Sequence, residues 1–292
     1  MERGAAKPQT QQNERSEFLR RAEQTCEPRH SPTRPKAGAA PKYPPTPTEK
    51  QELYNIMCTV TYLPLGKDQF VLTSNRDESA RRQPEGIFKN EEKGLIYPKE
   101  PSQGGTWIAA SDNGRLLCLL NGAFVKHKHQ PPYKRSRGLL VLDFFDYEDA
   151  PSFFEHYDFE GIEPFTLVIY ERGSLYQLRW DEQKAHVETL MPTEAYIWSS
   201  ATLYPAPIQA QRADWFTDWK CQQGTYRPES VWQFHQEGGQ GDIENGLVMY
   251  RNNGIVQTVS HTQVVLEKER FKMRYYDRMS QEEYLAEQAT QL

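Results

Sequence analysis

Apolar and polar positions alternate along much of the chain after residue 57, and this period is typical of β-strands. Three pairs of such runs are joined by short turns that contain glycine, and each pair predicts a β-hairpin. The predicted pairs are residues 58–63 with 69–74, 106–110 with 116–120, and 164–170 with 175–180. Further strands are predicted at residues 255–259, 263–267 and 271–276.

Helical spacing of apolar residues lies between and after these strands. It predicts helices at residues 138–147, 152–157, 207–220 and 228–236. Antiparallel hairpins with helices interspersed predict an α+β protein in which helices cover two packed sheets.

Residues 1–56 differ from the rest, because they are rich in Pro, Gln and charged residues and poor in aliphatic ones. Such a segment buries too little apolar surface to fold, so we expect it to be a disordered extension. It lacks the apolar run of a secretory signal, and its recurring glutamates do not fit a transit peptide. It is either a propeptide or the product of a misassigned start codon. We favour the second, because the codons of Gln51 and Glu52 can read as a ribosome-binding sequence before Met57.

Residues 57–292 are long enough for one domain with a sizeable core. The net charge of -5 argues against nucleic acid as a partner, and no apolar run reaches the ~18 residues of a membrane span. The cysteines of this domain form no CxxC pair, which favours a reducing cytoplasm. We expect a cytoplasmic protein with a small-molecule substrate or ligand. The sequence predicts no cofactor, metal or particular oligomeric state.

Cys58 directly follows Met57 at the head of the first predicted strand. If the mature chain begins at Cys58, its thiol is a nucleophile and its own α-amine, with an ordinary pKa near ~8, is a base. One residue then supplies two catalytic roles. The alternative is a free cysteine that packs in the core, as most free cysteines do.

Several motifs follow one another in the domain. They are Met57-Cys58-Thr59-Val60, Ser74-Asn75-Arg76-Asp77-Glu78, Gly104-Gly105-Thr106-Trp107, Leu120-Asn121 with Ser136-Arg137-Gly138, and Trp198-Ser199-Ser200-Ala201-Thr202-Leu203-Tyr204. In order and spacing they resemble the NRDE family, also called the transport and Golgi organisation 2 family. That family is similar to N-terminal-nucleophile hydrolases of the penicillin V acylase and bile salt hydrolase type. The resemblance implies a four-layer αββα sandwich of two mainly antiparallel sheets, and amide-bond chemistry.

The resemblance also implies catalytic roles for Cys58, Arg76, Asp77 and Asn121. Cys58 would attack a carbonyl, while Asp77 would hold the α-amine in place. Arg76 would lower the pKa of the thiol or bind a substrate carboxylate. In an arbitrary protein, residues 75–78 would instead form a turn with surface ion pairs. Their position behind a strand headed by cysteine favours the catalytic interpretation.

Asn121 ends a predicted strand, so its amide is a candidate oxyanion-hole donor. The alternative is an ordinary Asn-Gly turn with Gly122. The other predicted substrate-binding residues are Asn75, Trp107, Arg137 and Ser200. For Trp107, core packing and a place in the pocket wall are both open.

Two features depart from the family pattern and weaken the case for efficient hydrolysis. Ser199-Ser200 stands where relatives commonly carry Leu-Ser-Asn, and residues 257–261 lack the late arginine of the hydrolases. The loop at residues 126–137 adds further alternatives. His127 and His129 could bind a metal, the basic run could attract an anionic substrate, or the loop could simply be solvated.

Two classes of function therefore stand side by side. One is an N-terminal-cysteine hydrolase or acyltransferase that acts on an amide or acyl bond of a small molecule. The other is a binding or trafficking protein without turnover, because family relatives have been linked to Golgi organisation, mitochondrial lipid metabolism and haem trafficking. A haem-binding protein would need an axial ligand, and the spacing of the histidines singles none out.

Overall fold

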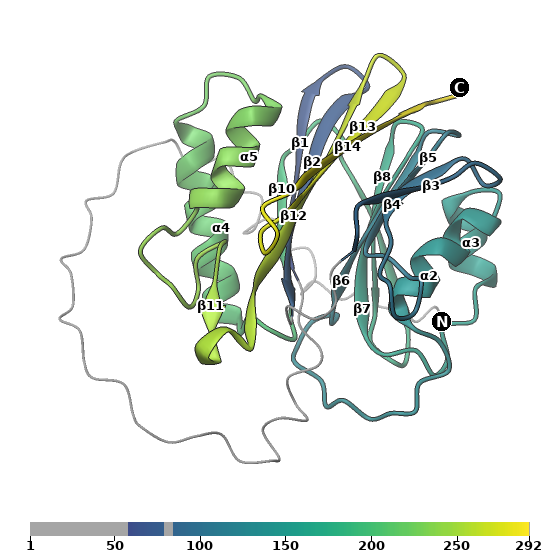
Figure 1. Cartoon of the computed structure of the whole chain (residues 1–292). Helices are drawn as coiled ribbons and strands as arrows, with labels where there is room; N and C mark the ends of the chain where they lie inside the picture. The colour runs from purple at the N-terminus through teal and green to yellow at the C-terminus, as the bar shows by residue number, and fades with distance from the viewer. Residues whose placement is uncertain (1–57, 79–83, 292) are drawn as a thin grey trace, which may run out of the picture. The chain divides into compact units, whose positions relative to one another are not determined.

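Two antiparallel sheets form the centre of the molecule in the computed structural model, which describes residues 58–78 and 84–291 (Figure 1). The first, sheet A, has the strand order β10-β1-β2-β12-β13-β14, with β11 paired to β12. The second, sheet B, runs β3-β4-β5-β6-β7-β8-β9. Among the described residues, no helix has the length and apolar character needed to cross a membrane.

Sheet A brings together strands from both ends of the domain. Its strands are β1 (Thr59–Gly66), β2 (Gln69–Glu78), β10 (Tyr196–Ser199), β11 (Tyr250–Arg251), β12 (Val256–Glu267), β13 (Arg270–Asp277) and β14 (Glu283–Ala289). The central pair is β2 and β12, which are almost 200 residues apart in sequence (Val71 pairs with Val265). The motif at residues 74–78 therefore lies in the middle of the sheet.

Sheet B is built from consecutive hairpins. Its strands are β3 (Ile87–Asn90), β4 (Leu95–Pro98), β5 (Ile108–Ser111), β6 (Arg115–Asn121), β7 (Phe165–Glu171), β8 (Ser174–Trp180) and β9 (Ala185–Leu190). Side chains of a strand alternate between the two faces of its sheet, as the residues of β6 do. Leu116, Cys118 and Leu120 pack between the sheets, whereas Leu117 and Leu119 pack on the opposite face.

Helices cover the outer face of each sheet (Figure 1). The helices are α2 (Arg137–Asp143), η2 (Phe144–Asp146), α3 (Ala150–His156), α4 (Ala206–Cys221), α5 (Pro228–Glu237) and η3 (Asn252–Gly254). One apolar cluster joins the two sheets, a second joins sheet B to α2 and α3, and a third joins sheet A to α4 and α5. These three clusters confirm the predicted four-layer αββα sandwich.

The three predicted hairpins, the four predicted helical regions and the predicted strand at residues 271–276 are present, but the other two late strands were predicted wrongly. Residues 255–259 and 263–267 are not two strands, because β12 continues through Ser260, His261 and Thr262. These polar residues look like an interruption in the sequence, yet all three are buried. The short strands β3, β4, β9, β10, β11 and β14 were not predicted.

Candidate functional site

Cys58 lies at the head of β1, and Ser200 connects it to the other sheet. The backbone N–H of Ser200 donates to the Cys58 carbonyl oxygen (3.1 Å), and its hydroxyl donates to the Asn121 carbonyl oxygen (2.8 Å). Asn121 is the last residue of β6. Ser200 therefore holds the start of β1 next to the end of β6, and so brings two predicted catalytic residues to one end of the sandwich.

The thiol of Cys58 is enclosed. Its side chain is 0% exposed and belongs to the cluster between the sheets. Burial, followed by the nearby Asp77 carboxylate, raises the pKa of the Cys58 thiol well above its usual range. Arg76 and the backbone N–H of Asp77 act in the opposite direction without reversing the shift. In this form of the chain the sulfur is therefore a neutral thiol.

Asp77 is a fully buried carboxylate with two hydroxyl donors. The Thr258 hydroxyl donates to its Oδ1 and the Tyr204 hydroxyl to its Oδ2, each at 2.6 Å. Burial raises the pKa of Asp77, and the charge of Arg212 together with the two hydroxyl donors opposes that rise. Both carboxylate oxygens are thus held in fixed directions beside Cys58.

Tyr204 and Arg212 complete this buried network, and neither is exposed. The Arg212 guanidinium lies over the Tyr204 ring, 3.6 Å from its centroid. Its N–H groups donate to the carbonyl oxygens of Asn245 and Gly246 and to the Thr59 hydroxyl. Sequence reasoning missed both residues, although Tyr204 ends the later motif at residues 198–204.

Asn75 lies in β2, as Asp77 does, but its side chain forms hydrogen bonds in the interior between sheet A and α5. Its Nδ2 donates to the carbonyl oxygens of His235 (2.9 Å) and Leu247 (2.7 Å). Because that fixes the orientation of the amide, Oδ1 must accept from the Nδ1 atoms of His235 (2.7 Å) and His261 (2.8 Å). Asn75 has its hydrogen-bonding capacity used within the protein, and it does not line the cavity described next.

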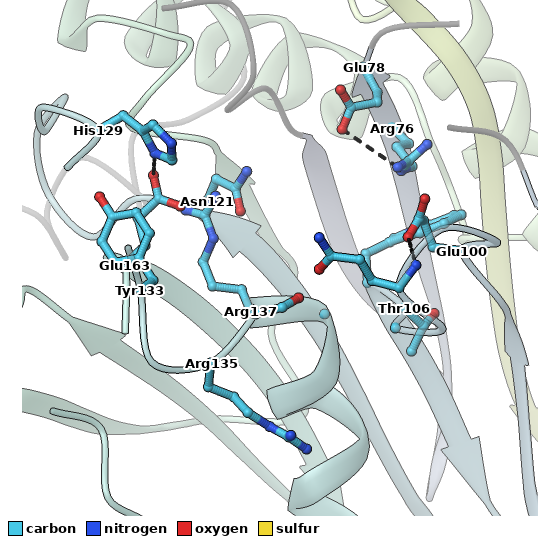
Figure 2. Close-up of a pocket in the computed structure, with 15 residues that line it drawn as sticks. Arg76, Glu78, Glu100, Thr106, Asn121, His129, Tyr133, Arg135, Arg137 and Glu163 are labelled. Atoms are coloured by element: carbon cyan, nitrogen blue, oxygen red, sulfur yellow. Dashed lines mark hydrogen bonds and ion pairs between the residues drawn. The ribbon is translucent and has the colours of Figure 1, made fainter. Parts of the chain in front are cut away.

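A cavity of about 390 Å³ opens beside this network. Figure 2 shows the polar side chains that converge on it from both sheets and from the start of α2. Its lining is mostly polar or charged: Arg76, Glu78, Glu100, Gln103, Gly105, Thr106, Trp107, Asn121, His129, Tyr133, Arg135, Ser136, Arg137, Gly138 and Glu163. Four of the eight predicted site residues are in this lining, namely Arg76, Trp107, Asn121 and Arg137. Cys58, Asn75, Asp77 and Ser200 are not.

Arg76 and Trp107 form one wall of the cavity. The Arg76 guanidinium lies 4.6 Å from the centroid of the Trp107 ring, and its Nη2 is 3.6 Å from Oε2 of Glu78. Trp107 is 2% exposed and also packs in the cluster between the sheets. It is therefore both a core residue and part of the cavity wall, so the two alternatives considered for it are compatible.

The opposite wall is organised around Glu163. Its carboxylate accepts from Arg137 (2.8 Å), from Nε2 of His127 (2.9 Å) and from Nδ1 of His129 (3.0 Å). Burial alone would raise the pKa of Glu163, but these partners together lower it. Arg137 also donates to the Pro164 carbonyl oxygen (2.9 Å). Glu163 was not predicted, because no motif surrounds it in the sequence.

The two glycine-containing motifs meet in the lining of the cavity. The Thr106 N–H donates to the Gly138 carbonyl oxygen (3.0 Å). A Cβ atom on Gly105 would lie 2.7 Å from the Gly138 carbonyl carbon, which is too close for any other residue. Direct backbone contact between residues 104–107 and the start of α2 therefore places Arg137 opposite Trp107.

Asn121 presents its side chain to the cavity with an unused acceptor. Its Oδ1 is buried and has no hydrogen-bond partner among the residues that the structure describes. A buried unpaired amide oxygen is costly, so such an atom in a cavity indicates a place for a ligand or for ordered water. The amide can serve the predicted oxyanion role only if its nitrogen points at the substrate.

His127 and His129 share one carboxylate rather than gathering further ligands. Within residues 58–78 and 84–291, no three His, Cys, Asp or Glu side chains come together in a way that could hold a metal ion. The hydrogen bonds to Glu163 give both histidines a role in ordering the loop at residues 126–137.

Comparison with known proteins identifies relatives. Solved structures similar to this chain include a Caenorhabditis elegans ortholog of N-acylethanolamine-hydrolyzing acid amidase (10% identity, 70% of this chain and 92% of that chain, TM-score 0.49). A mutant of the conjugated bile acid hydrolase from Clostridium perfringens is another (10% identity, 79% and 92%, TM-score 0.46). No curated protein sequence matches. The family model of transport and Golgi organisation 2 matches residues 57–257. The chain therefore belongs to the transport and Golgi organisation 2 family.

Proposed function

We propose that this protein, when its chain begins at Cys58, is a hydrolase or acyltransferase that acts on an amide or other acyl bond of a small molecule. The observation that carries the proposal is the placement of Cys58 at the head of β1, next to the buried Asp77 carboxylate and tied through Ser200 to Asn121. The start of the family match at residue 57 supports a domain that begins there.

In the proposed reaction, the Cys58 sulfur attacks the carbonyl carbon of the substrate and its proton passes to the α-amine. The negative charge that develops on the carbonyl oxygen is stabilised by the Asn121 amide nitrogen. The C–N bond then breaks, and the departing amine takes the proton from the α-ammonium group. Water or another acceptor releases the acyl group from the thioester. Asp77 holds the α-amine throughout.

The cavity lining favours a polar partner for this chemistry. Apart from the aromatic rings of Trp107 and Tyr133, no large aliphatic or aromatic side chain lines it, and arginines and glutamates face it from several elements. The part of the substrate that occupies this space is therefore polar or charged, because a hydrocarbon chain would desolvate these charged groups without adding a hydrogen bond. We propose that Arg76 and Arg137 position that polar part.

The proposal is tested by comparing the full chain with a chain that begins at Cys58. The shorter form can be released from a cleavable tag and verified by intact mass. A panel of activated acyl amides should give product and a covalent acyl adduct at Cys58 with the shorter chain only. Cys58→Ala should abolish both, and Cys118→Ala serves as the control because Cys118 is the other buried cysteine of the inter-sheet cluster. If the chain that begins at Cys58 gives neither product nor acyl adduct, the proposal is overturned.

A second function is favoured by the state of the thiol in the full chain. Cys58 is enclosed and neutral while the cavity opens beside Arg76 and Asn121. That arrangement suits a protein that binds the polar part of a ligand, such as a carboxylate of haem or the head group of an acyl lipid, without turnover. Equilibrium titration of the full chain with haem and with acyl lipids distinguishes the two, since saturable binding unchanged by Cys58→Ala supports a carrier.

The domain boundary and the location are part of the same proposal. We propose that residues 1–56 are absent from the active protein and that it acts in the cytoplasm. N-terminal sequencing of the protein from its own cell, after fractionation, tests both.

A further inference from the structure

Two buried side chains of opposite charge lie on the helix side of sheet A, since Asp77 and Arg212 are both 0% exposed. Burying an ion costs several kcal/mol unless an opposite charge or hydrogen bonds compensate it. Among the described residues, Asp77 and Arg212 form no direct ion pair with each other. Tyr204 lies between them instead, with its ring under the Arg212 guanidinium and its hydroxyl on the Asp77 carboxylate.

Arg212 reaches the start of β1 as well. It donates to the hydroxyl of Thr59, the residue that follows Cys58, and to the carbonyl oxygens of Asn245 and Gly246. One side chain of α4 thus contacts both the neighbour of Cys58 and the tyrosine that orients Asp77. If the chain began at Cys58, its α-amine would lie one residue away from the contact between Arg212 and Thr59.

We propose that Tyr204 and Arg212 are positioning residues of the Cys58 centre, which hold Asp77 as an oriented carboxylate anion against the first residue of the domain. The catalytic consequence rests on the proposed function, but the electrostatic role does not. Arg212 provides the compensating positive charge through the Tyr204 ring, and Tyr204 fixes one carboxylate oxygen while Thr258 fixes the other.

Other groups that face Asp77 have different positions and do not replace this pair. Arg251 approaches the Tyr204 ring at 5.2 Å, and its N–H groups are committed to Glu244, Asn245 and Leu203. Arg278 also acts on Asp77 electrostatically, but its Nη1 donates to His261. Cys58 itself is the group on which the Asp77 charge acts.

The test uses the pH dependence of Cys58 alkylation by iodoacetamide, resolved by peptide mass spectrometry, on both the full chain and the chain that begins at Cys58. Because the Asp77 anion disfavours a nearby thiolate, Asp77→Asn should lower the apparent pKa of the Cys58 thiol by about one unit. Tyr204→Phe should shift it in the same direction by about half a unit, because a carboxylate that loses a donor is more readily protonated. Arg212→Met should shift it likewise, and Arg212→Lys should restore much of the original value.

Turnover should fall in the variants in which alkylation of Cys58 becomes faster. In the chain that begins at Cys58, Tyr204→Phe should reduce turnover about 10-fold or more while alkylation at neutral pH becomes faster, since the α-amine loses its oriented anion. Tyr62→Phe is the matched control, because Tyr62 is also buried and donates instead to the Pro192 carbonyl oxygen. Arg115→Met is the control for Arg212, since Arg115 is 2% exposed and lies in sheet B.

The outcomes separate this inference from the proposed function. A Tyr204→Phe shift of the same size in the Asp77→Asn background, or no shift at all, would overturn the positioning role. A shift that depends on Asp77, in a protein without turnover in either form, would leave the positioning role in place and reject the hydrolase. If Arg212→Met does not fold, the isosteric Tyr204→Phe variant and Arg212→Lys still decide the question.

Discussion

The two faces of β2 differ sharply within one short motif. Asn75 and Asp77 face the helix layer and have hydrogen-bond partners inside the protein, whereas Arg76 and Glu78 face the cavity. The alternation of side chains in a strand separates them in this way. A contiguous motif therefore has two separate structural roles, an internal framework of hydrogen bonds on one face and part of the cavity wall on the other. The four residues 75–78 should therefore not be treated as one catalytic unit.

The largest expected effect lies on the framework face. Asn75→Ala removes four hydrogen bonds and leaves buried partners on His235, His261 and Leu247 unsatisfied. We expect the free energy of unfolding to fall by about 4 kcal/mol or more, measured by urea denaturation. Glu78→Gln, two strand positions away from Arg76 and on the cavity face, is the comparison. A loss of similar size in both variants would mean that the two faces do not differ.

Acid should weaken the framework through its histidines. Burial and then Arg212 lower the pKa of His235 to about 3, and burial and neighbouring charges lower the pKa of His261 as well. Both accept protons more readily when unfolded, where the ordinary pKa is ~6.5. Their neutral forms therefore contribute full stability above pH ~6.5, and this contribution falls as the pH drops from ~6.5 toward the folded pKa.

For His235 alone, the loss between pH 6.5 and 4 should be on the order of 3 kcal/mol. Urea denaturation at these two pH values measures it. In His235→Gln the dependence on pH should be visibly shallower. An unchanged slope would show that this histidine is not a buried neutral group.

A smaller effect is expected on the cavity face at Glu163. Glu163→Gln keeps the shape but removes the charge that binds Arg137, His127 and His129. We expect about 2 kcal/mol less stability, together with faster hydrogen exchange across residues 126–135. Glu160→Gln is the control, because its carboxylate is in none of the ion pairs of the described residues. Exchange that stays slow in Glu163→Gln would show that other contacts order the loop.

The smallest expected effect has the opposite sign. Thr262 is buried between the sheets, and its hydroxyl has no hydrogen-bond partner among the described residues. Thr262→Val removes a desolvated hydroxyl at nearly constant volume, so we expect stability to rise by about 1 kcal/mol. Thr258→Val, which removes a donor to Asp77, should instead lower it. Destabilisation by Thr262→Val would reveal a partner for that hydroxyl, such as ordered water or a ligand.

The sequence predicted the elements with strong local patterns and missed those whose patterns are weak. The hairpin β1–β2 alternates clearly, but β14 reads EYLAEQA, with few residues that favour strands. β12 was divided because Ser260, His261 and Thr262 are polar. Their burial depends on partners such as Asn75, which lies 186 positions from His261, and no local pattern contains such pairs.

Prediction of the site residues was limited in the same way, because a local motif does not show which distant residues the folded chain brings together. Motifs led to Arg76, Trp107, Asn121 and Arg137, which line the cavity. They did not lead to Glu163 or Arg212, because each acts through residues that only the folded chain brings near it. Alternation within β2 was available in the sequence, and it could have separated Asn75 from Arg76.

The contact between Gly105 and Gly138 sets a practical limit for engineering. Since a Cβ atom at Gly105 would clash with the Gly138 backbone, this part of the cavity lining cannot be reshaped by a side chain at Gly105 without moving the backbone of residues 104–107 or of α2. Redesign of ligand preference should therefore begin at the rim, where Gln103 and Arg135 are exposed and can be exchanged with little structural cost. Ligand preference would then change with the residues around the opening of the cavity, while the backbone contact between Gly105 and Gly138 is kept.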